Sequence, residues 1–514
     1  MSVNAVSEQR RDRLYSGWRR ERFGWFLGLT GPQLILCGIV ALPVLLAIGR
    51  SRWLLTLELI PIASVAIALV VVPIRGRPAV RWLTDVCMYA WGKAMGWSQW
   101  RSKAATGSAT TEELRQPDLP GVLAGLRMHD GPPFGPTLQR VCVLQDSVAG
   151  RWAAVARITH PGLGAADAET RNHYADQLGA LLASAARGEQ ISRVSFVVRT
   201  VPDDGAHRAA WLADNRWAHA PAVVTQISAQ LENAVTSAAV RHEVYVTIAV
   251  DERKIRRQAA QAGGGVVGRA RVLYRHLQEM EGHLRGMGAT SVEWLHTEDV
   301  AGAIRTGYNP ADAATLERAR QEQARNRPTT TGVPPGAAGP VNAPAPPARS
   351  YVHDAWTTVS YALMLPDLPT RVGAMAQLLA PSTPGERRTL ALHYEPQNPQ
   401  KASKEVERDI WTAEMAEDVR RKRGFRVSRE QRRRSAEVAS HESQLAAGHT
   451  MVRVAGAAAV TVPSTWPAED HAATFEAAVR ACHFRPLRLE LAQDTGFVAA
   501  CLPLGIGLPD RSAA

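Results

Sequence analysis

The chain has few groups of residues whose types and spacing would support catalysis. The nucleotide-binding pattern G-x-x-x-x-G-K-[ST] does not occur in the sequence, and neither do the G-x-S-x-G elbow of serine hydrolases or the H-E-x-x-H zinc motif. Acidic residues are spread over predicted helix surfaces, so no pair suggests a general acid and base. The sequence therefore nominates no catalytic residue, and we expect the protein not to be an enzyme.

One glycine-rich stretch, GGGVVG at residues 263–268, matches the spacing G-x-G-x-x-G. In a dinucleotide site this pattern follows a strand directly, so that the pyrophosphate meets the N-terminus of the next helix. Here residues 251–262, which are charged and rich in Ala and Gln, separate it from the preceding predicted strand. We therefore interpret the glycines as a flexible break before a helix rather than a nucleotide site, and expect no cofactor.

Two histidines could be considered as metal ligands. His276 and His283 lie two turns apart on one predicted helix, with Glu279 and Glu281 between them. Histidines on the surface of a charged helix are much commoner than metal sites, so we favour that interpretation and expect no metal.

The most unusual charged segment is a predicted helical hairpin at residues 402–447. Acidic residues come first, and a basic cluster follows. That cluster could contact DNA phosphates or a protein partner. Because Phe425 is its only aromatic residue, stacking on single strands is poorly supported, and a solvated or partner-facing hairpin is favoured over DNA contact. The cluster consists of Arg420, Arg421, Lys422, Arg423, Arg426, Arg429, Arg432, Arg433 and Arg434.

An apolar block at residues 23–74, broken only at 50–52, suggests two helices of about 20 residues, the length that crosses a bilayer. It predicts a transmembrane hairpin with helices at about 24–49 and 53–74. Flanking arginines and lysines place both termini in the cytoplasm by the positive-inside rule. A buried hairpin of a soluble protein and a signal peptide are the less favoured alternatives.

Half of the tryptophans lie near these two segments, where indole rings would anchor a helix at the membrane interface. They are Trp18, Trp25, Trp53, Trp82, Trp91, Trp97 and Trp100. Residues 79–100 alternate aromatic and basic side chains, which fits an interfacial helix or equally the first helix of a soluble domain. Residues 1–103 thus form a predicted membrane domain.

Composition and size fit a protein of several domains. The 514 residues exceed what one core holds, and the net charge of +12 points to an acidic partner such as anionic lipid or nucleic acid. Five scattered cysteines favour a reducing compartment and argue against a disulfide framework.

The remaining chain alternates strand-like and helix-like segments, which predicts the α+β class. Two ferredoxin-like α/β sandwich domains are expected at 104–325 and 351–514, joined by a disordered Pro/Gly/Ala-rich linker at 326–350. Strands are predicted at 139–145, 153–158, 191–199, 243–250, 291–295, 357–364, 388–394, 451–462 and 487–491. Helices are predicted at 168–186, 220–240, 266–287, 370–379 and 468–482.

The arrangement resembles a known family. The hairpin followed by GRPAVRWLTDVCMYAWGKAMGWSQWRS, from Gly76, looks like the PrgI-type membrane subunit of type IV secretion systems. The later chain resembles the N-terminal, non-ATPase region of the VirB/TraC-type conjugation ATPase, as fused in actinobacterial conjugative elements. The segments that carry this likeness are STPGERRT at 382–389, ESQLAAGH at 442–449 and CLPLGIGL at 501–508.

The resemblance implies a non-enzymatic inner-membrane scaffold of a conjugative DNA-transfer apparatus. Such a subunit would dock a separate ATPase and other channel subunits in a multimeric assembly. The alternative is a membrane-anchored DNA-binding adaptor that uses the basic cluster. An enzyme of unrecognised type is the third possibility.

Overall fold

The structure is a computed structural model that forms two compact units, one of residues 18–99 and one of residues 1–17 and 100–514. It describes residues 13–15, 31–71, 73–74, 77–136, 138–202, 211–212, 215, 217, 219–238, 240–324, 332–366, 369–398, 400, 403–404, 443 and 449–506.

The smaller unit is helical. Helices α2 (Gly31–Gly49) and α3 (Trp53–Val71) pack against each other as a hairpin, and α4 (Ala79–Met95) follows after the short strands β1 (Pro73–Ile74) and β2 (Arg77–Pro78). Ser51 has a φ of 55°, the left-handed conformation that closes the tight turn between the two helices. Many large side chains of the hairpin are exposed, among them Ile35, Leu45 and Leu54.

The predicted transmembrane hairpin is wrong. Among the described residues, none of the helices combines the length and the apolar character that crossing a membrane requires. As described, α2 and α3 contain 19 residues each. At about 1.5 Å per residue, each covers about 28 Å, slightly less than a hydrocarbon core of about 30 Å.

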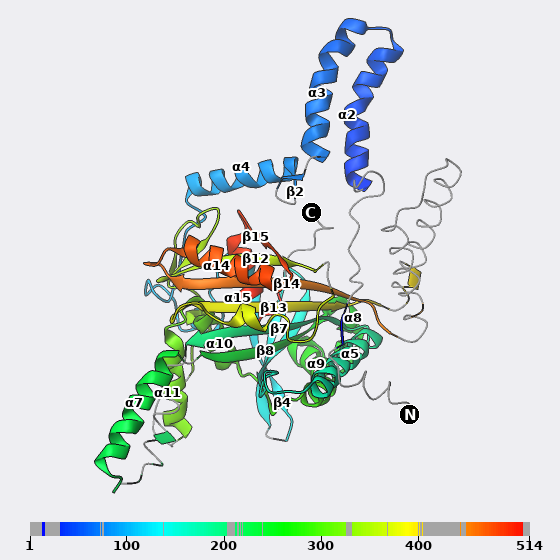
Figure 1. Ribbon diagram of the computed structural model, residues 1–514. Helices are drawn as coiled ribbons and strands as arrows, with labels where there is room; N and C mark the ends of the chain where they lie inside the picture. The colour runs from blue at the N-terminus through cyan, green and yellow to red at the C-terminus, as the bar shows by residue number, and fades with distance from the viewer. Residues whose placement is uncertain are drawn as a thin grey trace, which may run out of the picture. The chain divides into compact units, whose positions relative to one another are not determined.

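The larger unit is built on one antiparallel sheet (Figure 1). Nine strands follow each other across it in the order β11-β12-β14-β13-β7-β8-β6-β5-β4, and β15 and β9 join at β12 and β6. The strands are β4 (Leu126–Phe134), β5 (Gln139–Asp146), β6 (Arg151–Thr159), β7 (Ile191–Pro202), β8 (Val240–Asp251), β9 (Ser291–Trp294), β11 (Tyr351–His353), β12 (Trp356–Met364), β13 (Arg387–Pro396), β14 (Val452–Pro463) and β15 (Arg485–Arg488).

Each half of the sheet contains the strand order of a ferredoxin-like unit. In the first half the order is β9-β6-β8-β7, and in the second it is β15-β12-β14-β13. If the four strands of each half are numbered along the chain, their spatial order in the sheet is 4-1-3-2 in both halves. Each half also carries its long insertion between the second and third strands: residues 203–239 in the first and 397–451 in the second.

The two halves are not the separate sandwich domains that the sequence predicted. Strand β7 of the first half pairs with β13 of the second, with Val194 opposite Tyr394 and Arg199 opposite Thr389. Strand edges left unpaired are open hydrogen-bonding surfaces. Joining the two edges removes both of them and produces a single sheet.

The helices cover both faces of this sheet. One face packs against α5 (Ala168–Arg187), α8 (Glu252–Gln261) and α9 (Gly265–Gly286) in the first half and α14 (Ala468–Ala481) in the second. The opposite face carries one core shared by the two halves, under α10 (Thr297–Tyr308) and α15 (Gln493–Cys501). Helix α11 (Asp312–Ala324) follows α10.

Part of the predicted linker is packed rather than disordered. Residues 325–331 lie outside the described residues, but Ala338 and Ala343 are buried in the shared core. Strand β10 (Asn342–Ala343) pairs with β3 (Trp100–Arg101). Gly336 lies so close to Leu114 that an added Cβ would be 2.7 Å from its Cα. The small residues that suggested a linker thus allow close packing.

The edge strand β4 is protected by a side chain. Gln116 accepts a hydrogen bond from the backbone N–H of Met128 at 3.2 Å and donates one to its carbonyl at 3.0 Å. The amide therefore imitates a neighbouring peptide group. Further along β4, Pro132 and Pro133 interrupt the hydrogen-bonding edge.

Candidate functional site

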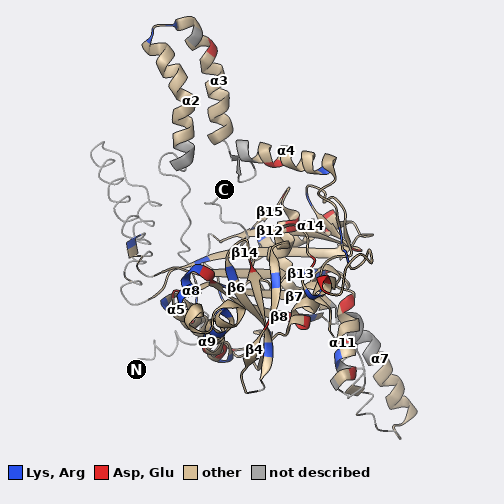
Figure 2. Cartoon of the chain, turned by 180° about the vertical axis from the view of Figure 1, so that it is seen from behind, with Lys and Arg blue, Asp and Glu red and all other residues tan. Residues whose placement is uncertain are grey.

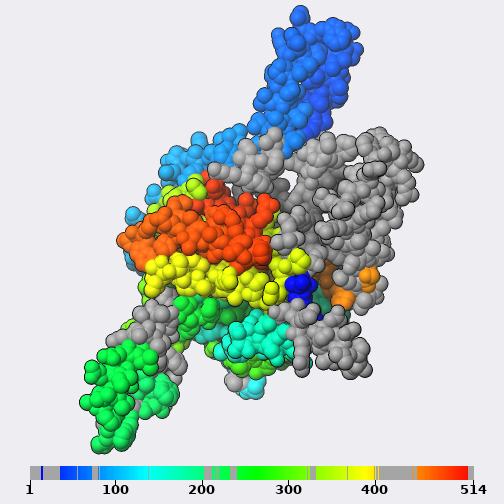
Figure 3. Space-filling view, in the orientation of Figure 1, coloured from blue at the N-terminus to red at the C-terminus, as the bar shows by residue number. Residues whose placement is uncertain are grey.

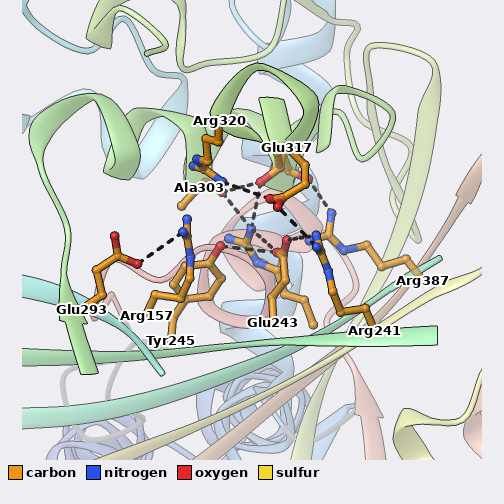
Figure 4. A network of polar contacts seen from close by, with 11 residues as sticks. Arg157, Arg241, Glu243, Tyr245, Glu293, Ala303, Glu317, Arg320 and Arg387 are labelled. Carbon is orange, nitrogen blue, oxygen red and sulfur yellow. Dashed lines mark hydrogen bonds and ion pairs between the residues drawn. The ribbon is translucent and has the colours of Figure 1, made fainter. Parts of the chain in front are cut away.

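A belt of charged side chains crosses four adjacent strands on the face that α10 covers (Figure 4). Arg157 comes from β6, Glu243 and Tyr245 from β8, Arg199 from β7 and Arg387 from β13. The sheet register aligns them, because Arg157 lies opposite Tyr245 and Arg199 opposite Glu243. Residues that are far apart in the sequence thus meet through strand pairing.

Arg199 is fully buried and reaches into α10. Its Nη1 donates to the carbonyl oxygen of Ala303 at 2.8 Å and to Oγ1 of Thr306 at 3.3 Å. The guanidinium lies 5.0 Å from the centre of the Tyr245 ring, a cation–π distance. Helix and aromatic ring together hold the guanidinium in one orientation.

Arg387 is 2% exposed and binds the same helix near its end. Its Nη1 donates to the carbonyl oxygen of Thr306. Burial, and next the positive charge of Arg199, lower the pKa of Arg387 to about 10, so it remains charged at neutral pH. A cation is favourable here because the last carbonyls of a helix lack partners within the helix and carry partial negative charge.

His353 binds another of these carbonyls. Its Nδ1 donates to the oxygen of Tyr308 at 2.6 Å, and its Nε2 then accepts from Oγ1 of Thr358 at 2.8 Å. A carbonyl oxygen can only accept, which assigns the proton to Nδ1. Burial lowers the pKa of His353 to about 3, so the ring is neutral.

Glu243 is the acidic centre of the belt. Its carboxylate lies 4.0 Å from Nη1 of Arg199 and 3.5 Å from Nη2 of Arg241, and it accepts a 3.4 Å hydrogen bond from the hydroxyl of Tyr245. Burial alone would raise the pKa of this carboxyl, but the surrounding arginines, Arg199 foremost, lower it. Glu243 is therefore ionised at neutral pH.

The outer members of the belt form ion pairs nearer the surface. Arg157 pairs with Glu293 at 3.6 Å, Arg320 of α11 with Asp299 at 3.3 Å, and Arg241 with Glu317 at 4.0 Å. The first pair joins β6 to β9, the second joins α11 to α10, and the third joins α11 to β8.

A serine–histidine pair is also present but is inaccessible. Ser195 and His393 lie opposite each other on β7 and β13, and Oγ donates to Nδ1 at 2.8 Å because Nε2 donates to the carbonyl of Ala499. Both residues are buried. Such a pair could activate a nucleophile, but no substrate can reach it, so it serves to join the two halves of the sheet.

The glycine-rich pattern lies in the turn between α8 and α9. Gly263, Gly264 and Gly265 all have positive φ. A Cβ on Gly268 would lie 2.1 Å from the carbonyl oxygen of Ala259, so this glycine permits close packing of the two helices. The strand before it is followed directly by α8, so the arrangement is not that of a dinucleotide fingerprint.

Among the residues considered as metal ligands, His276, Glu279 and Glu281 have separate partners. His276 lies 2.8 Å from Oε1 of Gln190, Glu279 accepts from Ser184, and Glu281 accepts from Arg285 at 2.8 Å. Within the described residues no group of His, Cys, Asp and Glu could hold a metal ion.

The predicted anchoring tryptophans lie in different environments. Trp53, Trp91 and Trp97 are exposed and Trp82 is half-buried, all in the smaller unit. Trp100 instead packs against the shared core of the sheet unit. Trp18 and Trp25 lie outside the described residues, as do residues 420–434 and hence the whole basic cluster.

A cavity of about 340 Å³ lies away from the belt, lined in part by Lys103, Glu113, Asp118 and Gly336. Its polar groups already bind one another: Lys103 donates from Nζ to Glu113 at 3.2 Å and from its backbone to Asp118 at 2.8 Å. They are not directed at a ligand.

The chain matches none of the protein-family models and none of the curated proteins with which it was compared. The belt was not among the sites predicted from the sequence. Its charged members occur within strands that are rich in Val, Ala and other apolar residues, and this is the one signal that could have indicated them.

Proposed function

We propose that this chain is a non-enzymatic scaffold subunit of a type IV secretion-like DNA-transfer apparatus, which docks a separate ATPase. The likeness of its sequence segments to that family supports the assignment to the apparatus. The belt supports a scaffold because Arg199 and Arg387 each donate from Nη1 to α10 and so join elements of the chain's own fold.

The observation that carries the docking proposal is an exposed apolar helix. Helix α7 (Ala222–Ala238) lies in the insertion between β7 and β8 and projects from the sheet (Figures 1 and 3). Val223, Ile227 and Leu231 are 65%, 58% and 62% exposed, and Val224 is exposed beside them. Val224, Ile227 and Leu231 follow helical spacing and form one apolar stripe.

The chemistry of α7 fits a protein partner. Its 17 residues include one charged residue, Glu232, and no lysine or arginine, and the part of α7 that is not grey in Figure 2 is tan. Exposed apolar surface of this kind marks interaction sites, and an amphipathic helix is commonly bound in an apolar groove. DNA, by contrast, is bound by basic side chains.

Purification of the tagged full chain from its native cells, followed by chemical cross-linking and mass spectrometry, tests this proposal. Recovery of an ATPase with a nucleotide-binding P-loop, with cross-links to the 211–240 segment, is the expected result. Recovery of DNA without an ATPase would overturn it. In that case, replacement of Arg420, Arg421 and Arg423 by alanine should release the DNA, as the adaptor hypothesis requires.

A further inference from the structure

Two buried arginines carry hydrogen-bond donors that no described group accepts. Arg199 and Arg387 use Nη1 to bind α10, but their Nε and Nη2 atoms have no partner among the described residues. A buried donor without an acceptor loses its hydration and gains nothing in return, and for a charged group this cost is larger. These four N–H-bearing atoms therefore indicate a missing acceptor.

Each guanidinium keeps free the pair of donors that binds an oxyanion. The Nε–H and one Nη2–H of a guanidinium point to the same side and form a fork that takes two oxygens of a phosphate or carboxylate. The same fork is free in both arginines. Because Arg199 binds Oγ1 of Thr306 and Arg387 binds its carbonyl oxygen, both guanidiniums lie at the same residue.

The charges of the belt also lack one anion. Arg157, Arg241 and Arg320 pair with Glu293, Glu317 and Asp299. Arg199 and Arg387 then have only Glu243 between them, which leaves one positive charge in excess. The Glu243 carboxylate lies 4.0 Å from Nη1 of Arg199 and is hydrogen-bonded to Tyr245, so it occupies neither fork.

We propose that Arg199 and Arg387 bind one small oxyanion of the inorganic phosphate type. Two forks would supply four charge-assisted hydrogen bonds, and the Tyr245 ring under Arg199 keeps one fork in position. Complete burial of Arg199 limits the ligand to a small ion and excludes a nucleotide. The partly exposed Arg241, Glu317 and Arg320 lie on the solvent side, where an ion would enter.

Equilibrium dialysis of the full chain against radiolabelled inorganic phosphate, with chloride keeping the ionic strength constant, measures this binding. The wild-type chain should bind one phosphate saturably. Arg387→Lys keeps the charge and one donor for Thr306 but removes the fork, so we expect at least tenfold weaker binding. The matched control is Arg285→Lys on the exposed surface of α9, which should bind like wild type.

A second variant tests the same site by the opposite effect. Glu243→Gln removes the nearest competing negative charge, so phosphate should bind about tenfold more tightly. Absence of saturable binding in the wild type would overturn the proposal, as would equal affinity in Arg387→Lys. If Arg387→Lys does not fold, the phosphate affinity of Glu243→Gln tests the proposal instead. An affinity equal to that of the wild type would refute the site.

Discussion

Arg387 of β13 donates a hydrogen bond from Nη1 to the carbonyl oxygen of Thr306, in the last turn of α10. The strand belongs to the second half of the sheet and the helix follows the first half. One guanidinium therefore stabilises a helix end and joins two parts of the chain that the sequence suggested were independent.

Replacement of this arginine should destabilise the fold strongly. Arg387→Met removes the hydrogen bond to Thr306 and reduces the positive charge around the carboxylate of Glu243, whose side chain is only 14% exposed. We expect a loss of about 3 kcal/mol or more in the free energy of unfolding, measured by urea denaturation. Arg285→Met, at an exposed ion pair, should change it by less than about 0.5 kcal/mol. Equal losses in both variants would contradict the structural role of Arg387.

Glu243 should make stability fall at acid pH. Its pKa is lowered in the folded state from an ordinary value of 4.5, so its stabilising effect is complete above pH 4.5 and is lost as the pH falls through the lower folded value. Glu243→Gln should cost about 2 kcal/mol at pH 7. In urea denaturation from pH 7 to pH 3, the free energies of unfolding of the wild type and the variant should converge below pH 4.5. A difference that stays constant with pH would disprove this.

His353 should contribute a separate dependence on pH. Burial lowers its pKa from 6.5 to about 3, so below pH 6.5 the unfolded chain binds a proton that the folded chain excludes. The free energy of unfolding is therefore unaffected by this group above pH 6.5, and it falls by about 1.4 kcal/mol per pH unit on acidification below that pH. From pH 6.5 to pH 5 this amounts to about 2 kcal/mol. His353→Gln, which keeps a donor for Tyr308, should remove that part of the slope in urea denaturation, and an unchanged slope would refute the assignment.

The shared core should unfold as one unit. Phe497 of α15 is buried against the rings of Tyr308 and Tyr351, at centroid distances of 4.8 and 5.3 Å. Phe497→Ala should cost about 3–5 kcal/mol. Hydrogen exchange should show reduced protection in β7 as well as in β13. Loss of protection confined to the second half would mean that the halves are stable separately.

The α7 stripe should matter for binding and not for stability. Ile227→Glu places a charge on an exposed apolar side chain, so the free energy of unfolding should change by less than about 0.5 kcal/mol. Recovery of the ATPase in the purification should fall at least tenfold. Val148→Glu, at an exposed residue in the turn between β5 and β6, serves as the control and should retain the partner. Retention by both variants would remove α7 from the docking surface.

Local patterns predicted most of the individual elements. Alternating and continuous apolar runs predicted strands close to β6, β7, β8, β12 and β13, and helical spacing predicted α5, α9 and α14, because burial of one face is a local requirement. The predicted helix at 370–379 is instead mainly turns with one short 3₁₀ helix, η4 (Ala376–Leu379). Gly373, at a φ of 85°, adopts a left-handed conformation that interrupts an α-helix.

By itself the sequence indicated the α+β alternation and a long segment inserted at 402–447, but it did not indicate that residues 203–239 form a second insertion. It could not show that β7 and β13 would pair, because strand pairing between distant segments depends on which edges the completed halves leave open. It could not show the charged belt either. Arg199, Glu243 and Arg387 lie in three separate strands, and only the register of the assembled sheet brings them to the end of one buried helix.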